Sequence, residues 1–185
     1  SQASLLEVLN SEFTGGQFEV WPGRPYSDGA IIATHNSFVT LVQCLITDCT
    51  VEGNGGAVVS VENSDIAVVN CTIVGNTATG NGGGVFADSG AVQLVNTIVR
   101  DNGPTNMFIE GRVLQPSTLE YCNIEGGWPG FGNIDTDPLF VDAESGDYTL
   151  QPGSPCIDTG SPMITDFDEG SSDMGYTGGG GPTPE

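Results

Sequence analysis

The sequence predicts an all-β fold, a right-handed parallel β-helix (β-solenoid) of about five coils with non-repeat N- and C-terminal caps. Two observations predict it: an internal repeat of about 27 residues, and a composition dominated by Val, Ile, Thr, Asn and Gly. Only 15% of residues are charged and 28 are glycine, which disfavours long amphipathic helices. Leucine-rich repeats have a similar period, but this sequence lacks their Leu ladder and helix.

The repeat is clearest in the segments 29–54 and 56–81, which align without a gap at a shift of 27 residues. Ten aligned positions are identical. A third copy, with a small deletion, covers 84–102, and a degenerate fourth covers 107–124. A period of about 23 to 27 residues with short strands is typical of one coil of a parallel β-helix.

Each copy contains three short apolar runs, which predict three sheets. The predicted strands are 31–32, 58–59 and 85–86 in one sheet, 38–42, 65–69 and 92–95 in a second, and 45–46, 72–74 and 98–99 in a third. Stacked coils lie about 4.8 Å apart, so like residues stack in apolar columns. We expect Asn36 with Asn63, and Asn54 with Asn81, to stack at corners, where Asn tolerates a left-handed backbone.

Four segments follow from this pattern. Residues 29–127 hold the coils. Residues 1–28 lack the repeat, start with an apolar stretch that predicts a short helix or a first strand, and form an N-terminal cap or a subunit contact. Residues 128–176 hold the last coil and an acidic C-terminal cap, and residues 177–185 are a Gly/Pro-rich tail.

The charge is extreme, with 24 acidic residues against three arginines and a formal net charge of −21. Nucleic acid is excluded as a partner because three arginines cannot build a basic patch. No apolar run approaches the roughly 18 residues of a membrane span. The acidic surface suits metal cations, high-salt surroundings or a cationic partner, or serves solubility alone.

Acidic residues are densest near the C-terminus, around two short predicted strands at 139–141 and 148–150. Calcium binds six to eight oxygen ligands, often from acidic loops. The candidate ligands for Ca²⁺ are Asp135, Asp137, Asp142, Asp147, Asp166 and Asp168. The run from Asp166 is superficially similar to an EF-hand loop, but its Gly is one position early and Thr177 stands at the twelfth position. The alternative is solvated acidic turns.

Five cysteines fall in or after the repeat, and Cys44 and Cys71 share one column on adjacent coils. Their predicted spacing suits a disulfide, but a column of reduced, buried thiols is favoured. Cys49 faces Asn76 and has no obvious cysteine neighbour. The sequon at Asn70 falls within a predicted strand, which argues against glycosylation.

Two further cysteines, Cys122 and Cys156, pair only if the last coil brings them together. An odd number of cysteines leaves at least one thiol free. A catalytic cysteine needs a histidine, and the sequence has only His35, with no third group implied. We therefore predict no catalytic residues and no bound organic cofactor.

Several strings carry a family resemblance: NCTIVGN, GNGGGVF, EGGWPGFGNIDTDPLFVD, GDYTLQPGSPCIDTG and DMGY. They resemble secreted right-handed parallel β-helix proteins of the pectate-lyase-like superfold, in particular those in which a choice-of-anchor module follows the helix. The resemblance runs from about Gly29 to Tyr176. It implies an exported, often surface-linked β-helix, but that group has no single activity.

Lyases of this superfold typically use calcium and an Arg or Lys base. Arg100 and Arg112 are the candidates within the coils, and no carboxylates cluster beside either in the repeat register. Early acidic residues do not form the facing pair that an inverting glycosidase needs. Aromatic residues near the ends are predicted to plug the solenoid, with sugar stacking as the alternative: Trp21, Trp128, Phe131 and Tyr148.

These observations predict a non-enzymatic structural domain that is extracellular or at the cell surface, because lysine is absent and Asn and Thr are abundant. Its partner is itself, in a filament or surface layer joined through the solenoid ends and terminal segments. The alternative is a carbohydrate-binding or polysaccharide-processing domain whose partner is an extracellular glycan.

Overall fold

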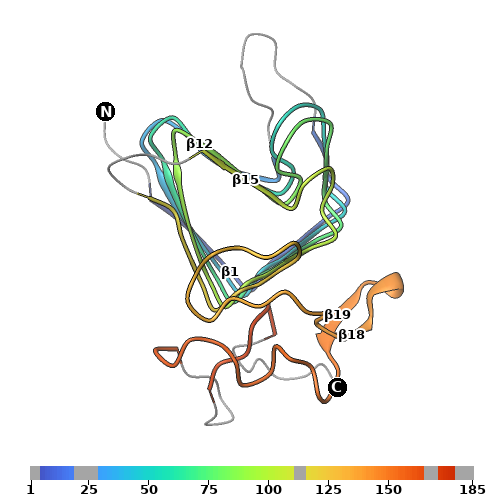
Figure 1. The fold of residues 1–185 in the computed structure, drawn as a ribbon. Helices are drawn as coiled ribbons and strands as arrows, with labels where there is room; N and C mark the ends of the chain where they lie inside the picture. The colour runs from blue at the N-terminus through green and yellow to red at the C-terminus, as the bar shows by residue number, and fades with distance from the viewer. Residues whose placement is uncertain (1–4, 19–28, 111–115, 165–170, 178–185) are drawn as a thin grey trace.

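The structure, a computed structural model, describes residues 5–18, 29–110, 116–164 and 171–177. Four parallel sheets wind as a right-handed solenoid, so the predicted fold class is confirmed (Figure 1). Within one turn the chain passes through sheets A, B, C and D in that order. The described residues include no helix with the length and apolarity needed to cross a bilayer.

Sheets A and B each contain five strands. Sheet A contains β1 (Leu5–Leu9), β5 (Phe38–Val42), β9 (Asp65–Val69), β13 (Ala91–Val95) and β16 (Thr118–Glu120). Sheet B contains β2 (Glu12–Thr14), β6 (Leu45–Thr47), β10 (Thr72–Val74), β14 (Ile98–Arg100) and β17 (Asn123–Ile124). The strands predicted for these two sheets from the repeat agree with the structure.

Sheets C and D complete the turn. Sheet C contains β3 (Gln17–Phe18), β7 (Thr50–Val51) and β11 (Thr77–Ala78). Sheet D contains β4 (Ile31–Ala33), β8 (Val58–Val61), β12 (Val85–Asp88) and β15 (Met107–Glu110). Sheet C was not predicted, because strands of two residues are too short to show an alternating pattern.

The predicted count of about five coils needs a correction. In the described ranges, three turns carry a strand in all four sheets, β1–β4, β5–β8 and β9–β12. A fourth turn has no strand in sheet C, and a fifth has only β16 and β17. The solenoid therefore has about three complete turns and two partial ones, because the later copies are shortened.

Register places like residues above one another, as the repeat predicts. Inward-facing side chains of successive turns form buried columns, among them Leu41–Val68–Leu94, Ile46–Ile73–Val99 and Ile31–Val58–Val85. Each buried Val, Leu or Ile stabilises the fold by about 1.5–3 kcal/mol. These columns fill the interior, which is continuous from β1 to β17.

The corner between sheets A and B repeats a left-handed residue in every turn: Asn10, Gln43, Asn70, Asn96 and Tyr121, with φ between 46° and 53°. Such a backbone costs most residues energy, and Asn tolerates it best after Gly. Asn36 and Asn63 adopt φ of 62° at the corner between sheets D and A, as predicted. Asn70 is thus a corner residue, and its predicted place within a strand is wrong.

A polar ladder lines the corner between sheets B and C. Asn76 is fully buried and accepts a hydrogen bond from the Cys49 amide at 3.1 Å. Its own amide group donates to Ile46 O (2.9 Å), Val74 O (3.1 Å) and Asn102 Oδ1 (2.9 Å). This ladder satisfies corner groups that the sheets leave unpaired.

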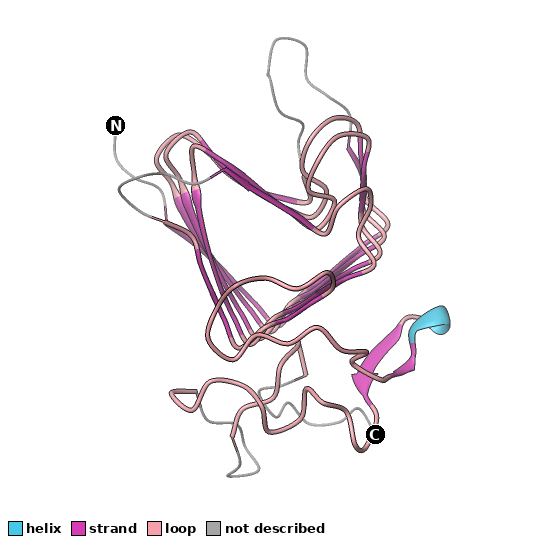
Figure 2. Ribbon diagram, in the orientation of Figure 1, coloured by secondary structure: helices cyan, strands magenta, loops and turns pink. Residues whose placement is uncertain are grey.

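The C-terminal segment lies along the outer face of sheet B (Figure 2). Its hairpin pairs β18 (Phe140–Asp142) with β19 (Asp147–Leu150) around the 3-10 turn η1 (Ala143–Ser145). Tyr148 packs against Leu45 and Val74, while Cys156 and Met174 pack against Ile98. The segment 128–176 was predicted to hold the last coil and an acidic C-terminal cap. Its described residues 135–164 and 171–176 lie against the side of the coils, because sheet B presents apolar residues outward as well as inward.

Candidate functional site

The acidic C-terminal residues were the first candidates for a site. Asp137, Asp142 and Asp147 each accept a hydrogen bond from a backbone amide two or three residues later, at 2.9–3.3 Å. Such contacts shape turns. The side-chain hydrogen bond from Thr149 lowers the pKa of Asp147. These three carboxylates therefore serve their own turns.

The structure does not gather these acids into a common ligand set. In the ranges that it describes, no three His, Cys, Asp or Glu side chains lie close enough to hold one metal ion. Asp135 pairs instead with an arginine. Asp166 and Asp168 lie outside the described residues. Calcium binding in this segment stays a prediction, without support from Asp135, Asp137, Asp142 or Asp147.

Arg100 binds both ends of the segment that folds over the last turn. Its side chain is 15% exposed, and its guanidinium donates to Asn123 Oδ1 (3.1 Å) and Asp135 Oδ1 (3.2 Å). The other Asp135 oxygen accepts from the Gly126 amide at 3.2 Å. The repeat register predicted no carboxylate beside Arg100 because Asp135 lies beyond the repeat, and only the fold of residues 125–135 brings Asp135 close.

Glu125 belongs to the same region. It accepts hydrogen bonds from the Asn106 amide group (2.9 Å) and the Asp101 backbone (2.8 Å). The Asn106 hydrogen bond, followed by the Asp101 bond and the charge of Arg100, lowers the pKa of Glu125. A carboxylate held ionised in this way stabilises the loop and is unsuited to act as a general acid.

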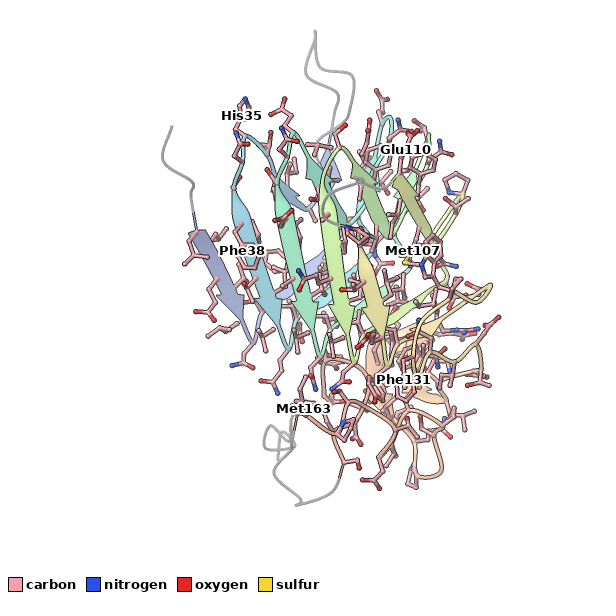
Figure 3. The ribbon with its side chains drawn as sticks, turned by 60° about the vertical axis from the view of Figure 1, so that its left-hand side comes forward. His35, Phe38, Met107, Glu110, Phe131 and Met163 are labelled. Atoms are coloured by element: carbon pink, nitrogen blue, oxygen red, sulfur yellow. The ribbon has the colours of Figure 1, made fainter. Side chains whose placement is uncertain are left out.

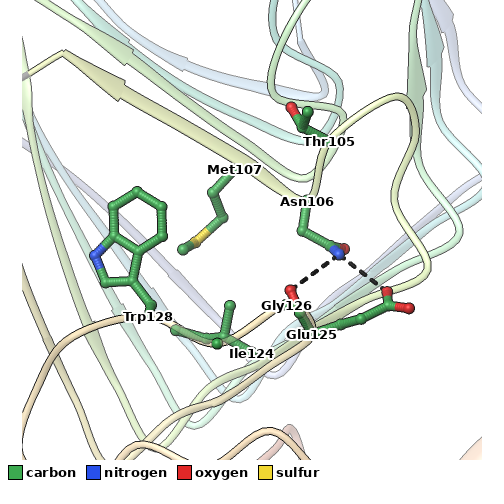
Figure 4. Close-up of a pocket in the computed structure, with 8 residues that line it drawn as sticks. Thr105, Asn106, Met107, Ile124, Glu125, Gly126 and Trp128 are labelled. Atoms are coloured by element: carbon green, nitrogen blue, oxygen red, sulfur yellow. Dashed lines mark hydrogen bonds between the residues drawn. The ribbon is translucent and has the colours of Figure 1, made fainter.

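A cavity of about 180 Å³ lies beside Glu125 at the C-terminal end of the interior (Figure 4). Met107, Ile124 and Trp128 form its apolar wall, and Thr105, Asn106 and Glu125 its polar one. Pockets that bind drug-sized ligands have volumes of about 300–1,000 Å³, so this cavity suits at most a small ring.

Trp128 also packs against the interior core, as the plug prediction requires. The prediction fails for Tyr148, which lies outside sheet B, because the hairpin that carries it packs laterally. Phe131 is exposed and meets the edge of the Tyr121 ring. Trp21 lies outside the described residues, as does Arg112.

All five cysteines are buried free thiols. Cys44 and Cys71 share a column as predicted, and the Cys44 amide donates to Cys71 Sγ at 3.4 Å. The hydrogen bond from Cys71 lowers the pKa of Cys44 to about 7, while burial raises that of Cys71 well above its usual value. Cys122 points inward and Cys156 lies outside sheet B, so they do not pair.

His35 lies at an exposed corner between sheets D and A. Its Nδ1 is 2.9 Å from a carboxylate oxygen of Glu62, and the Thr34 hydroxyl contacts both groups. No described cysteine shares this corner, since all five lie in the interior or beneath the C-terminal segment. The cluster joins successive corners and supports no nucleophilic catalysis.

The N-terminal end differs from the C-terminal end. β1 is the outermost strand of sheet A, and the described residues place no strand on its far side (Figure 3). It exposes Leu5 (77%), Leu6 (53%) and Leu9 (49%). At the other end, residues 126–134 fold over the last turn, and Ile134 pairs with Asn123. One end is thus covered, and the other presents an apolar edge.

The signal for this edge was present in the sequence. The apolar stretch LLEVL continues the sheet A register, with Leu5 beside Phe38 and Leu9 beside Val42. This stretch has too little identity to the repeat to be aligned with it, so the sequence alone did not decide between a helix and a strand. Comparisons with models of known families, with curated proteins and with solved structures gave no match.

Proposed function

We propose that this protein is a non-enzymatic extracellular structural domain that self-assembles through an end of its solenoid. The observation that carries the proposal is the edge of β1, beyond which the described residues place no strand and where three of five residues are exposed leucines. A strand edge offers unpaired amide and carbonyl groups, and apolar side chains favour its burial. Extracellular placement rests on the composition and the family resemblance described above.

The proposal is tested by sedimentation velocity of the purified chain over a hundred-fold range of concentration, followed by negative-stain electron microscopy. We expect the sedimentation coefficient to rise with concentration, and particles longer than one solenoid to appear. Monomers at every concentration, in low and high salt, would refute the proposal. Parallel samples with calcium and with a chelator test the calcium prediction, because only a calcium-dependent contact changes between them.

The cavity beside Trp128 supports a second candidate, recognition of an extracellular glycan. An indole, an amide and a carboxylate around one small cavity are groups that bind sugar rings. A glycan array with the native chain and the Trp128→Ala variant tests it. Binding by the native chain that the variant loses would support recognition at this cavity, and a silent array would remove this candidate.

A further inference from the structure

We propose that two copies of this chain associate head to head, with β1 of one copy pairing antiparallel with β1 of the other across a two-fold axis. The inference rests on the proposed function and names its first contact. Simple head-to-tail stacking does not fit, because residues 126–134 cover the C-terminal end, whereas the described residues place no strand beyond β1 at the N-terminal end.

The free edge of β1 is defined by backbone alternation. The Asn10 amide donates to Val42 O at 3.0 Å, toward β5. Amide and carbonyl groups of a strand alternate between its two sides. Those of Leu5, Glu7 and Leu9 therefore point away from β5, to the side where the described residues place no partner.

These three positions are self-complementary. An antiparallel pair centred on Glu7 places Glu7 opposite its counterpart and Leu5 opposite Leu9 of the second copy. All three are then hydrogen-bonded pairs, which gives about six new backbone hydrogen bonds. Registers centred one residue earlier or later lose one of these three pairs. The edge thus fits a second copy in one register better than in its neighbours.

The side chains agree with this register. Leu6 and Val8 face the interior, because they stand beside the inward-facing Val39 and Leu41. A two-fold axis perpendicular to sheet A keeps both interiors on the same side of the joined sheet. Leu6 of one copy then lies opposite Val8 of the other, and the two open interior ends cover each other.

Charge opposes the same contact. Each copy carries a formal net charge of −21, and the register places two Glu7 side chains directly opposite. The Debye length, over which salt screens charges from one another, shortens from about 30 Å at 0.01 M salt to about 3 Å at 1 M salt. The dimer dissociation constant is therefore expected to fall as salt rises.

Substitutions at the edge separate this contact from any other. Glu7→Gln removes the opposed charges and is expected to tighten the dimer about two- to five-fold. Glu52→Gln is the control, because it makes the same change in net charge at an exposed position in another turn. We expect its dimer dissociation constant to lie within two-fold of the native value. Leu5→Glu is expected to weaken association more than ten-fold, and because Leu5 is 77% exposed the monomer tolerates it.

Disulfide trapping reads the register directly. In Glu7→Cys the two new cysteines face each other across the two-fold axis with a Cα separation of about 5.5 Å, which suits a disulfide. The native cysteines are buried and do not compete for this cross-link. Leu5→Cys alone does not cross-link, because its counterpart lies opposite Leu9. A mixture of Leu5→Cys and Leu9→Cys does. Circular dichroism checks that each variant folds.

The results distinguish two failures. Cross-linking of Glu7→Cys and of the Leu5→Cys and Leu9→Cys mixture, but not of Leu5→Cys alone, supports the head-to-head dimer. Assembly that continues with Leu5→Glu, or that leaves Glu7→Cys uncross-linked, overturns this contact and leaves the proposed function standing. Monomers under all conditions overturn both.

Discussion

Asn76 at the corner between sheets B and C offers the sharpest test of how the turns are held together. The Asn76→Ala substitution removes the acceptor of the buried Cys49 amide and the donors to Ile46 O and Val74 O. A buried amide left without a partner costs about 1–3 kcal/mol, and each lost hydrogen bond about 1 kcal/mol. We expect the free energy of unfolding to fall by about 3–5 kcal/mol.

The assay is urea unfolding followed by circular dichroism. Repeat proteins can unfold in steps, so midpoints are compared only where the slope is unchanged. Asn54→Ala is the matched control. Asn54 accepts a hydrogen bond from the Asn81 amide at 2.8 Å at an exposed corner, where water replaces it, and we expect a loss under about 1 kcal/mol. Equal losses in the two variants would refute the ladder as a source of stability.

Three further predictions follow from buried groups. Burial raises the pKa of Cys122 from 9.0 to about 12. Between these pH values the thiol ionises in the unfolded chain only, so the free energy of unfolding falls with rising pH by up to about 1.4 kcal/mol per pH unit. Urea midpoints measured at pH 8.5–10.5 should therefore fall less steeply with pH for Cys122→Ala than for the native chain, and equal slopes would contradict this. Met174→Ala, at a fully buried contact of the C-terminal segment, should cost about 2–5 kcal/mol, whereas Met163→Ala, 90% exposed, should change thermal stability little. Asn70 is buried and donates to Ser172 Oγ, so intact mass after secretion from a eukaryotic host should show no glycan there, while Ala143→Asn, which creates a sequon on an exposed turn, should gain one.

The sequence by itself determined the strands of sheets A, B and D within the repeat and the columns that they build. This prediction succeeded because equivalent residues of successive turns stack on one another, so that side-chain type and spacing repeat along the sequence. Cys44 above Cys71 and Ile46 above Ile73 could be placed from a shift of 27 residues alone. The left-handed corners at Asn36 and Asn63 followed from the backbone tolerance of Asn.

Only the tertiary structure decided which elements outside the repeat meet it. Arg100 finds Asp135 through the path of a loop, and Met174 reaches Ile98 across the outside of sheet B. Neither contact recurs from turn to turn, so no repeating pattern in the sequence predicts it. The open edge of β1 is decided in the same way. The sequence supplies Leu5, Leu6 and Leu9, but their exposure depends on which end of the solenoid the later chain covers.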